Sequence, residues 1–192
     1  MDGKKLKTCK ACKVKFAPVK PMQSVCSIQC ASALVAKKKA SQEAKKRQDD
    51  RKADKAKREK LKTRSDWMKD AQREFNRYVR LRDAGRPCIS CGVELVAGGV
   101  GGSYDCGHFR SVGSAPHLRF HEGNAHGQCK KCNRYGSGMH SDYRVRLIDL
   151  LGEDAVRAIE ADQTPRKYTI EDLKQIIAEY RAKAKAIESA NR

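Results

Sequence analysis

Two stretches of the chain repeat apolar residues at intervals of three and four positions, which is the pattern of an amphipathic helix. The first is expected to begin at a capping Ser65 and to end before Gly85 and Pro87; its apolar positions are Trp67, Met68, Ala71, Phe75, Tyr78 and Val79. The second is capped by Thr169, and its apolar face comprises Ile170, Leu173, Ile176, Ile177, Tyr180 and Ala184. We expect both faces to pack in a core; the alternative for the first is a platform that stacks on nucleic-acid bases.

The segments between these two helices are shorter. Residues 143–151 and 154–161 favour helix, whereas residues 93–97 and 103–110 are expected to form two strands joined by a glycine-rich tip at 98–102. That tip lacks the spacing and the Lys-Ser/Thr ending of a phosphate loop, so nucleotide binding is not expected there. Strands surrounded by helices predict an α+β fold.

Residues 31–62 have a different pattern. Lys, Arg, Ala, Glu and Gln dominate, and Leu34, Val35 and Leu61 are nearly the only sizeable apolar residues. This composition favours helix but provides no continuous apolar stripe. We expect an exposed basic helical arm or a linker, whose charge is either a solvated face or a contact for the DNA backbone.

These patterns divide the chain into three parts. Residues 1–30 form a small N-terminal module and residues 31–62 the basic arm. Residues 63–192 form the main domain, which comprises a first helix at 63–86, a central core at 87–140 and C-terminal helices at 141–192.

The charge balance is strongly basic, with 42 Lys and Arg against 23 Asp and Glu and a formal net charge of +19. Such a field favours a polyanionic partner. No apolar run approaches the roughly 18 residues that a membrane span requires, and the lysine-rich start is unlike a signal peptide. We therefore expect a protein of a reducing cytoplasm that makes no membrane contact.

Nine cysteines in a reducing compartment indicate metal ligation in preference to disulfides. Eight of them fall into close pairs that suit two structural zinc sites; the first site comprises Cys9, Cys12, Cys26 and Cys30, and the second Cys88, Cys91, Cys129 and Cys132. Phe16, Val19 and Val25 are expected to give the first module a minimal core. The ninth cysteine, Cys106, is expected to be a small buried residue.

The central core resembles the HNH (ββα-metal) nucleases, because a strand histidine is followed by Asn124, by Cys129 and Cys132, and then directly by Asn133. The resemblance implies that His108 is the general base that deprotonates water. It also implies that Asn124 braces the loop and the base, and that Asn133 binds a catalytic divalent ion at the start of a helix.

The implied chemistry suits hydrolysis of a phosphodiester. A histidine with a pKa near neutral accepts water's proton, and the oxygens of Asp105 and Asn133 suit Mg²⁺ or Mn²⁺ while the sulfurs suit zinc. One departure is that the family's usual carboxylate lies directly before the base, where this chain has Gly107 and carries Asp105 three residues before His108.

A closer resemblance, over nearly the whole chain, is to the NinG (Rap) recombination proteins of lambda-like phages. It rests on Arg64-Ser-Asp-Trp67, Pro87-Cys-Ile-Ser-Cys-Gly92, Ala115-Pro-His-Leu-Arg-Phe120, Asn124 to Asn133 and Tyr143-Arg-Val145. It implies an endonuclease in the host cytoplasm that cuts branched recombination intermediates, such as Holliday junctions and D-loops, with magnesium or manganese. Paired cuts would need a homodimer, and phage recombination proteins are further expected partners.

Other residues near the motif have two readings each. His126 either orients the scissile phosphate or forms a hydrogen bond within the site. Five cations are expected to hold DNA phosphates or to remain solvated: Arg110, Arg119, Lys130, Lys131 and Arg134. The rival hypothesis for the whole chain is a non-catalytic zinc-finger protein that binds nucleic acid as a recombination mediator or regulator.

Overall fold

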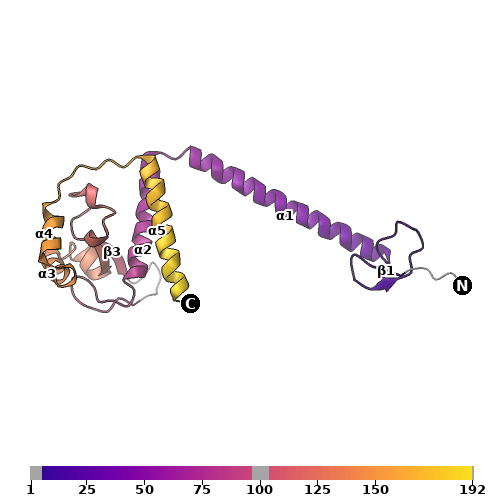
Figure 1. The fold of residues 1–192 in the computed structure, drawn as a ribbon, viewed down its shortest axis with the longest axis horizontal. Helices are drawn as coiled ribbons and strands as arrows, with labels where there is room; N and C mark the ends of the chain where they lie inside the picture. Colours follow the sequence, from indigo (N-terminus) through magenta and orange to yellow (C-terminus); the bar gives the residue numbers. More distant parts are fainter. Residues whose placement is uncertain (1–5, 97–103, 192) are drawn as a thin grey trace. The chain divides into compact units, whose positions relative to one another are not determined.

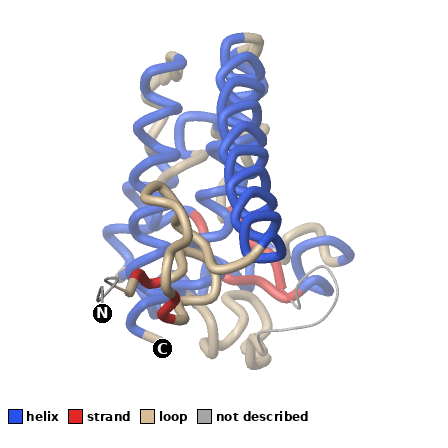
Figure 2. The backbone as a smooth tube through the Cα atoms, turned by 90° about the vertical axis from the view of Figure 1, so that its right-hand side faces the viewer, coloured by secondary structure: helices blue, strands red, loops and turns tan. Residues whose placement is uncertain are grey.

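A computed structural model describes residues 6–96 and 104–191 of the chain. The chain separates into two compact units, of which the first ends at Leu61 and the second begins at Lys62. Figure 1 colours the elements of both units along the sequence, and Figure 2 shows that helices make up most of the backbone while the strands are short. Each unit is described by itself.

The first unit is a cysteine-bearing hairpin followed by one long helix. Strand β1 (Lys7–Thr8) pairs antiparallel with β2 (Lys15–Phe16). Helix α1 (Ile28–Lys60) begins after Ser27, whose side-chain oxygen accepts a hydrogen bond from the Cys30 backbone N–H. The predicted basic arm is therefore a continuous helix, and it begins before the expected boundary at residue 30.

The first unit has almost no apolar core. Val19, which was expected to contribute to one, is exposed, and Phe16 and Val25 are only half-buried. That expectation was wrong for Val19. Cys9 is the fully buried side chain of the described part of this unit. Its fold therefore depends on its thiols rather than on apolar burial.

The second unit is built around two long helices, α2 (Arg64–Arg82) and α5 (Ile170–Ala190), which pack against each other (Figure 1). Thr169 caps α5 as predicted, with a reciprocal hydrogen bond to Asp172. The expected cap of α2 was wrong, because Thr63 rather than Ser65 holds that position. Thr63 has an acidic residue three positions later, which completes a capping box.

The predicted apolar faces of α2 and α5 meet in the main core, so the expectation of packing is confirmed. Phe75 and Tyr180 meet edge to face with ring centroids 4.8 Å apart. Phe120 joins them from the connecting segment, and its carbonyl accepts a hydrogen bond from the Tyr180 hydroxyl at 3.1 Å. This aromatic contact brings the segment before the second strand against the helix pair.

The small sheet consists of β3 (Tyr104–His108) and β4 (Ala125–Cys129), which run antiparallel. The prediction of a strand at 93–97 was wrong for residues 93–96, which the structure describes. Glu94 makes only an isolated bridge to Pro87 there. The predicted second strand is present, but its partner comes from the segment before Cys129. Residue 97 and the expected glycine tip at 98–102 lie outside the described residues.

The rest of the second unit covers the other side of the sheet. Short 3₁₀ turns at Pro116–Leu118 and Glu122–Asn124 connect the strands, and a π-helical turn, η3 (Lys131–Tyr135), follows β4. Helices α3 (His140–Leu151) and α4 (Glu153–Ala161) form a second core with Ile89, Phe109, Ala115 and Leu118. Both of these helices were predicted.

In the part of the chain that the structure describes, each helix is too short or too polar to span a lipid bilayer.

The packing of α5 predicts that two leucine-to-alanine substitutions lower the free energy of unfolding by different amounts. Leu173 is fully buried between α5 and α2, whereas Leu150 on α3 is 48% exposed. We expect Leu173→Ala to lower the free energy of unfolding by about 2 to 5 kcal/mol, because it removes buried methyl groups and leaves a cavity. Leu150→Ala is the matched control and should cost well under half as much in urea denaturation. Equal losses would contradict the assigned core.

Candidate functional site

Four cysteines of the second unit form a compact cluster. Cys88, Cys91, Cys129 and Cys132 place their sulfur atoms within 4.8 Å of one another. The Cys91 and Cys129 sulfurs are 3.8 Å apart, which matches the separation of about 3.8 Å that a tetrahedral zinc site with 2.3 Å Zn–S bonds requires. The cluster could therefore hold one zinc ion, as the sequence predicts.

The backbone around this cluster is arranged for thiolates. The Cys129 N–H donates to the Cys88 sulfur at 3.3 Å, and the Cys132 N–H donates to the Cys129 sulfur at 3.5 Å. Gly92 completes the turn after Cys88 with φ +77°, a conformation that favours glycine. Because Cys129 ends β4 and Cys132 lies in η3, a bound ion would join the sheet to the turn that follows it.

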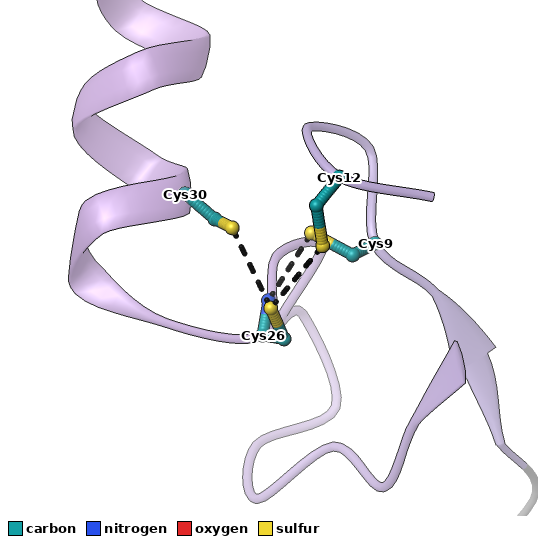
Figure 3. A group of neighbouring side chains, drawn as sticks. All are labelled: Cys9, Cys12, Cys26 and Cys30. Carbon is teal, nitrogen blue, oxygen red and sulfur yellow. Dashed lines mark hydrogen bonds between the residues drawn. The ribbon is translucent and has the colours of Figure 1, made fainter. Parts of the chain in front are cut away.

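The first unit holds a second cluster of the same kind, formed by Cys9, Cys12, Cys26 and Cys30 (Figure 3). The Cys26 sulfur is 3.6 Å from that of Cys12 and 3.5 Å from that of Cys30. Cys30 projects from the first turn of α1, so the cluster joins the hairpin to the helix. All nine cysteines lie within the described residues, and none forms a disulfide.

The thiols of each cluster do not ionise alike. A backbone hydrogen bond from Cys12 lowers the pKa of Cys9 to about 6, whereas a hydrogen bond with the Cys30 thiol raises the pKa of Cys26 to about 12. Four thiolates this close repel one another unless a cation compensates them, and Zn²⁺ with sulfur ligands does so. Cys106 lies apart from both clusters, and burial raises the pKa of its thiol to about 12.

Asp105 on β3 and Asn133 on η3 come together, as the predicted catalytic metal site requires. The Asn133 side-chain N–H donates to an Asp105 carboxylate oxygen at 3.2 Å. Arg134 also binds this carboxylate with two hydrogen bonds of 2.7 and 2.8 Å. The Arg134 hydrogen bonds lower the pKa of Asp105. The carboxylate is thus an anion at neutral pH and an oxygen donor suited to a hard divalent ion.

His108, the predicted base, lies at the end of β3 beside Phe75. Its Nε2 is 3.0 Å from the Arg119 carbonyl oxygen. Because a carbonyl only accepts, Nε2 carries the proton of the neutral ring and Nδ1 keeps its lone pair. Desolvation lowers the pKa of His108. The ring is therefore neutral at pH 7 and able to accept a proton through Nδ1.

Asn124 is fully buried and braces the loop after β3. Its side-chain oxygen accepts from the Arg110 N–H at 2.8 Å, and its side-chain N–H groups donate to the Arg110 and Leu118 carbonyls at 3.0 and 3.3 Å. All of these partners are backbone groups. The loop-bracing part of the predicted role agrees with these contacts, and the amide itself is closed to solvent.

His126 is also buried, and its contacts are internal. Tyr143 donates its hydroxyl proton to the Gly107 carbonyl at 3.1 Å, so the His126 Nδ1–H donates to the Tyr143 oxygen at 3.2 Å. Burial lowers the pKa of His126 to about 4. His126 was expected either to orient the scissile phosphate or to form a hydrogen bond within the site, and the structure contains such a hydrogen bond. Tyr143 belongs to the motifs of the family resemblance, but its hydrogen bonds with His126 and Gly107 follow only from the three-dimensional structure.

The position directly before His108 is occupied by Gly107 for a packing reason. A Cβ at residue 107 would meet the Gln128 side-chain oxygen and lie 2.9 Å from its Cβ. Gln128 is fixed there by hydrogen bonds of 2.7 Å to Ser90 and to the Gly138 carbonyl. The space before the base is therefore already filled.

Side chains along β3 point alternately to its two faces, and this separates Asp105 from His108 in the predicted site. Asp105 faces η3, whereas His108 faces α2 with Tyr104, which donates to the Arg80 carbonyl. Three residues of strand correspond to about 10 Å. The structure thus unites Asp105 with Asn133 and holds His108 on the other face of the strand.

Three of the five predicted phosphate-binding cations already have partners. Arg134 binds Asp105, Arg110 donates to the carbonyls of α4 and the following residue, and Arg119 donates to Gln72 at 3.0 Å. Lys131 is exposed and Lys130 half-buried. The two lysines are therefore the more accessible cations of this set.

Comparison with known proteins identifies a phage family. Residues 1–190 match the profile described as Bacteriophage Lambda NinG protein. The chain is 44% identical over 130 residues to Protein ninG of Escherichia phage lambda, covering 68% of this chain and 61% of that protein. It is 46% identical over 125 residues to Protein ninG of Salmonella phage P22, covering 65% and 59%. The chain thus spans less than two thirds of the length of these relatives. No solved structure matches it significantly.

The two clusters predict two zinc ions per chain. We expect elemental analysis of the purified protein to find two, and Cys129→Ser or Cys9→Ser each to remove one, because each cluster loses a ligand. Cys106→Ser is the matched control and should keep both ions. Loss of zinc from Cys106→Ser, or retention of both ions by the other two variants, would contradict the assignment.

Burial of His126 predicts a loss of stability on acidification. Its pKa is about 4 in the folded chain and about 6.5 in the unfolded chain, so between these values only the unfolded chain binds the proton. The free energy of unfolding should fall by about 1 kcal/mol between pH 7.5 and pH 5.5 from this group. His126→Gln should flatten this dependence, whereas the exposed control His121→Gln should not. Zinc content is checked at each pH.

Proposed function

The chain belongs to the bacteriophage lambda NinG protein family, and from this membership and the residues around β3 we propose that it is a divalent-metal-dependent endonuclease of the HNH type acting on branched DNA. The observation that carries the proposal is the contact between Asp105 and Asn133. These two oxygen-bearing side chains come from β3 and from the turn after the second cysteine pair; Asn133 lies at the HNH spacing, whereas Asp105 lies three residues before His108 instead of directly before it.

The metal site of this proposal comprises Asp105 and Asn133. A bound Mg²⁺ or Mn²⁺ would polarise the phosphate and stabilise the charge on the leaving oxygen. Asp105 is suited to hold such an ion because its carboxylate is ionised at neutral pH. Arg134 occupies the same two oxygens, so a cation at Asp105 competes with this guanidinium, which is then free to contact a phosphate.

His108 is the proposed general base. Its Nε2–H donates to the Arg119 carbonyl, which fixes the ring and leaves Nδ1 to accept a proton from water. The lowered pKa keeps this nitrogen unprotonated at working pH. Asn124 supports the base indirectly, because it ties Arg110 to Leu118, the residue directly before Arg119.

The proposal carries a geometric requirement. Asp105 and His108 lie on opposite faces of β3, so a single phosphate meets both only if it lies across the edge of the strand pair. Branched DNA, with strands that diverge from a duplex, is the substrate class that the family resemblance suggests. Paired cuts at such a branch are expected to involve two copies of the chain.

Replacing the base tests this proposal. We expect His108→Ala to lower Mg²⁺-dependent nicking of a four-way junction by at least about 100-fold, as for loss of a general base. Junction affinity and zinc content should remain unchanged, because His108 contacts neither cysteine cluster. His121→Ala, another histidine of the second unit but an exposed one, is the matched control and should cut normally.

Two further comparisons separate the alternatives. Asp105→Asn should raise the Mg²⁺ concentration needed for half-maximal nicking, whereas Cys106→Ser should not. Normal cutting by His108→Ala would remove this residue as the base. Equal binding of junction, duplex and single strand with no cutting by the wild-type chain would favour the rival function, a non-catalytic zinc-stabilised DNA-binding protein.

A further inference from the structure

Helix α1 is free of the contacts that normally occupy a protein helix. None of its 33 residues is buried. None of the ion pairs among the described residues involves it, although it carries twelve Lys and Arg and five Asp and Glu between Ile28 and Lys60. Its cations are therefore not neutralised by fixed partners within the described chain. The unit supplies no packing reason for their positions.

The charges of α1 are unevenly distributed around the helix, and half of its twelve cations share one arc. At about 100° per residue, six cations fall within an arc of about 140°, namely Lys37, Lys38, Lys45, Arg51, Lys52 and Lys55. Glu43, Asp50 and Asp54 fall together on the opposite side. Asp49 flanks the cationic arc, and Glu59 lies on it in the last turn. The arc from Lys37 to Lys55 is about 27 Å long, or roughly eight base pairs of duplex.

The same arc leads into a groove of the first unit. This groove, of about 390 Å³, lies between the turn after Cys9 and the start of α1, and four of its eight lining residues are lysines while none is acidic. Lys10 and Lys13 come from the turn, and Lys37 and Lys38 come from the helix. Lys37 and Lys38 thus belong both to the groove and to the cationic arc.

We propose that the groove and the cationic face of α1 form one continuous track that binds the phosphate backbone of duplex nucleic acid. This track comprises Lys10, Lys13, Lys37, Lys38, Lys45, Arg51, Lys52 and Lys55. It extends the proposed function, on which its DNA partner rests, by assigning a binding surface outside the cutting site. The first cysteine cluster positions the groove lysines, because it joins the turn that carries Lys10 to the helix through Cys30.

The chemistry of the track favours nucleic acid over an anionic membrane. A helix that lies in a lipid surface needs an apolar face beside its cations. Along the track Leu34 is the sizeable apolar residue, and it lies in the groove. The track consists of Lys and Arg side chains with no aromatic residue among them, and such cations suit phosphates, so we expect binding that depends little on base sequence.

The test uses two triple variants of the full chain with the same change in charge. The track variant is Lys45→Gln with Lys52→Gln and Lys55→Gln, and the control variant is Lys39→Gln with Lys46→Gln and Lys57→Gln on the other side of the helix. Affinity for a 30-base-pair duplex is measured by fluorescence anisotropy against salt concentration. Magnesium is omitted, so the result does not depend on cleavage. Circular dichroism and zinc content verify that both variants fold.

The track variant should lower the slope of log affinity against log salt by about 0.9 for each lost contact, or about 2.7 for all three. The control variant should change the slope by less than one contact. A second pair, Lys10→Gln in the groove and Lys20→Gln outside it, should differ in the same direction. Equal effects of the two triple variants would overturn the proposed track, because binding would then depend only on the total charge of the helix. Loss of binding to phosphatidylserine vesicles without loss on DNA would overturn the assigned partner.

Discussion

The two four-cysteine clusters, each able to hold a zinc ion, are the constraint on which both units depend. The sheet of the second unit has two strands of five residues, and a hairpin of that size is marginal in water without further support. Cys129 at the end of β4 and Cys132 in η3 connect it to the loop that carries Cys88 and Cys91. The register of the strands and the start of η3 are thereby set together. Asp105 and Asn133 meet because their backbones are held on either side of this cluster.

The hydrophobic cores play a different part from the cysteines. The α2–α5 core ends at Phe120 and His108, so it sets the depth of the histidine and, through desolvation, its neutral state. The second core holds Tyr143, which ties α3 to Gly107 and His126. The hydrophobic core thus keeps His108 neutral, while the second cysteine cluster sets the positions of Asp105 and Asn133. The two influences meet at β3.

The sequence predicted the helices and the cysteine sets well, because both signals are local. Thr169, the apolar faces of α2 and α5, and the four cysteine pairs are each visible as a spacing. The strand partner was missed because Val93 to Ala97 is mostly apolar and contains two β-branched residues, as strands often do, whereas Ala125-His-Gly-Gln-Cys129 has a glycine and polar residues that weaken the pattern. Thr63 rather than Ser65 caps α2 because Asp66, three positions after Thr63, completes a capping box.

The candidate site was only partly predictable. Spacing located Asp105, His108 and Asn133, and their backbone positions follow from the strand and the turn. The burial of Asn124 and His126, and the ion pair of Arg134 with Asp105, depend on contacts between distant segments that no local pattern encodes. The face on which His108 lies follows from strand alternation, but only once the strand limits are known.

The side chain of Gln128 across Gly107 has a consequence for how this site can change over evolutionary time. A carboxylate directly before the histidine and a large residue at 128 exclude each other sterically. Positions 107 and 128 should therefore covary, so that members gaining an acid at one carry a smaller residue at the other. In this chain residues 107 and 128 are a glycine and a glutamine, and the acidic residue of the strand is Asp105 instead.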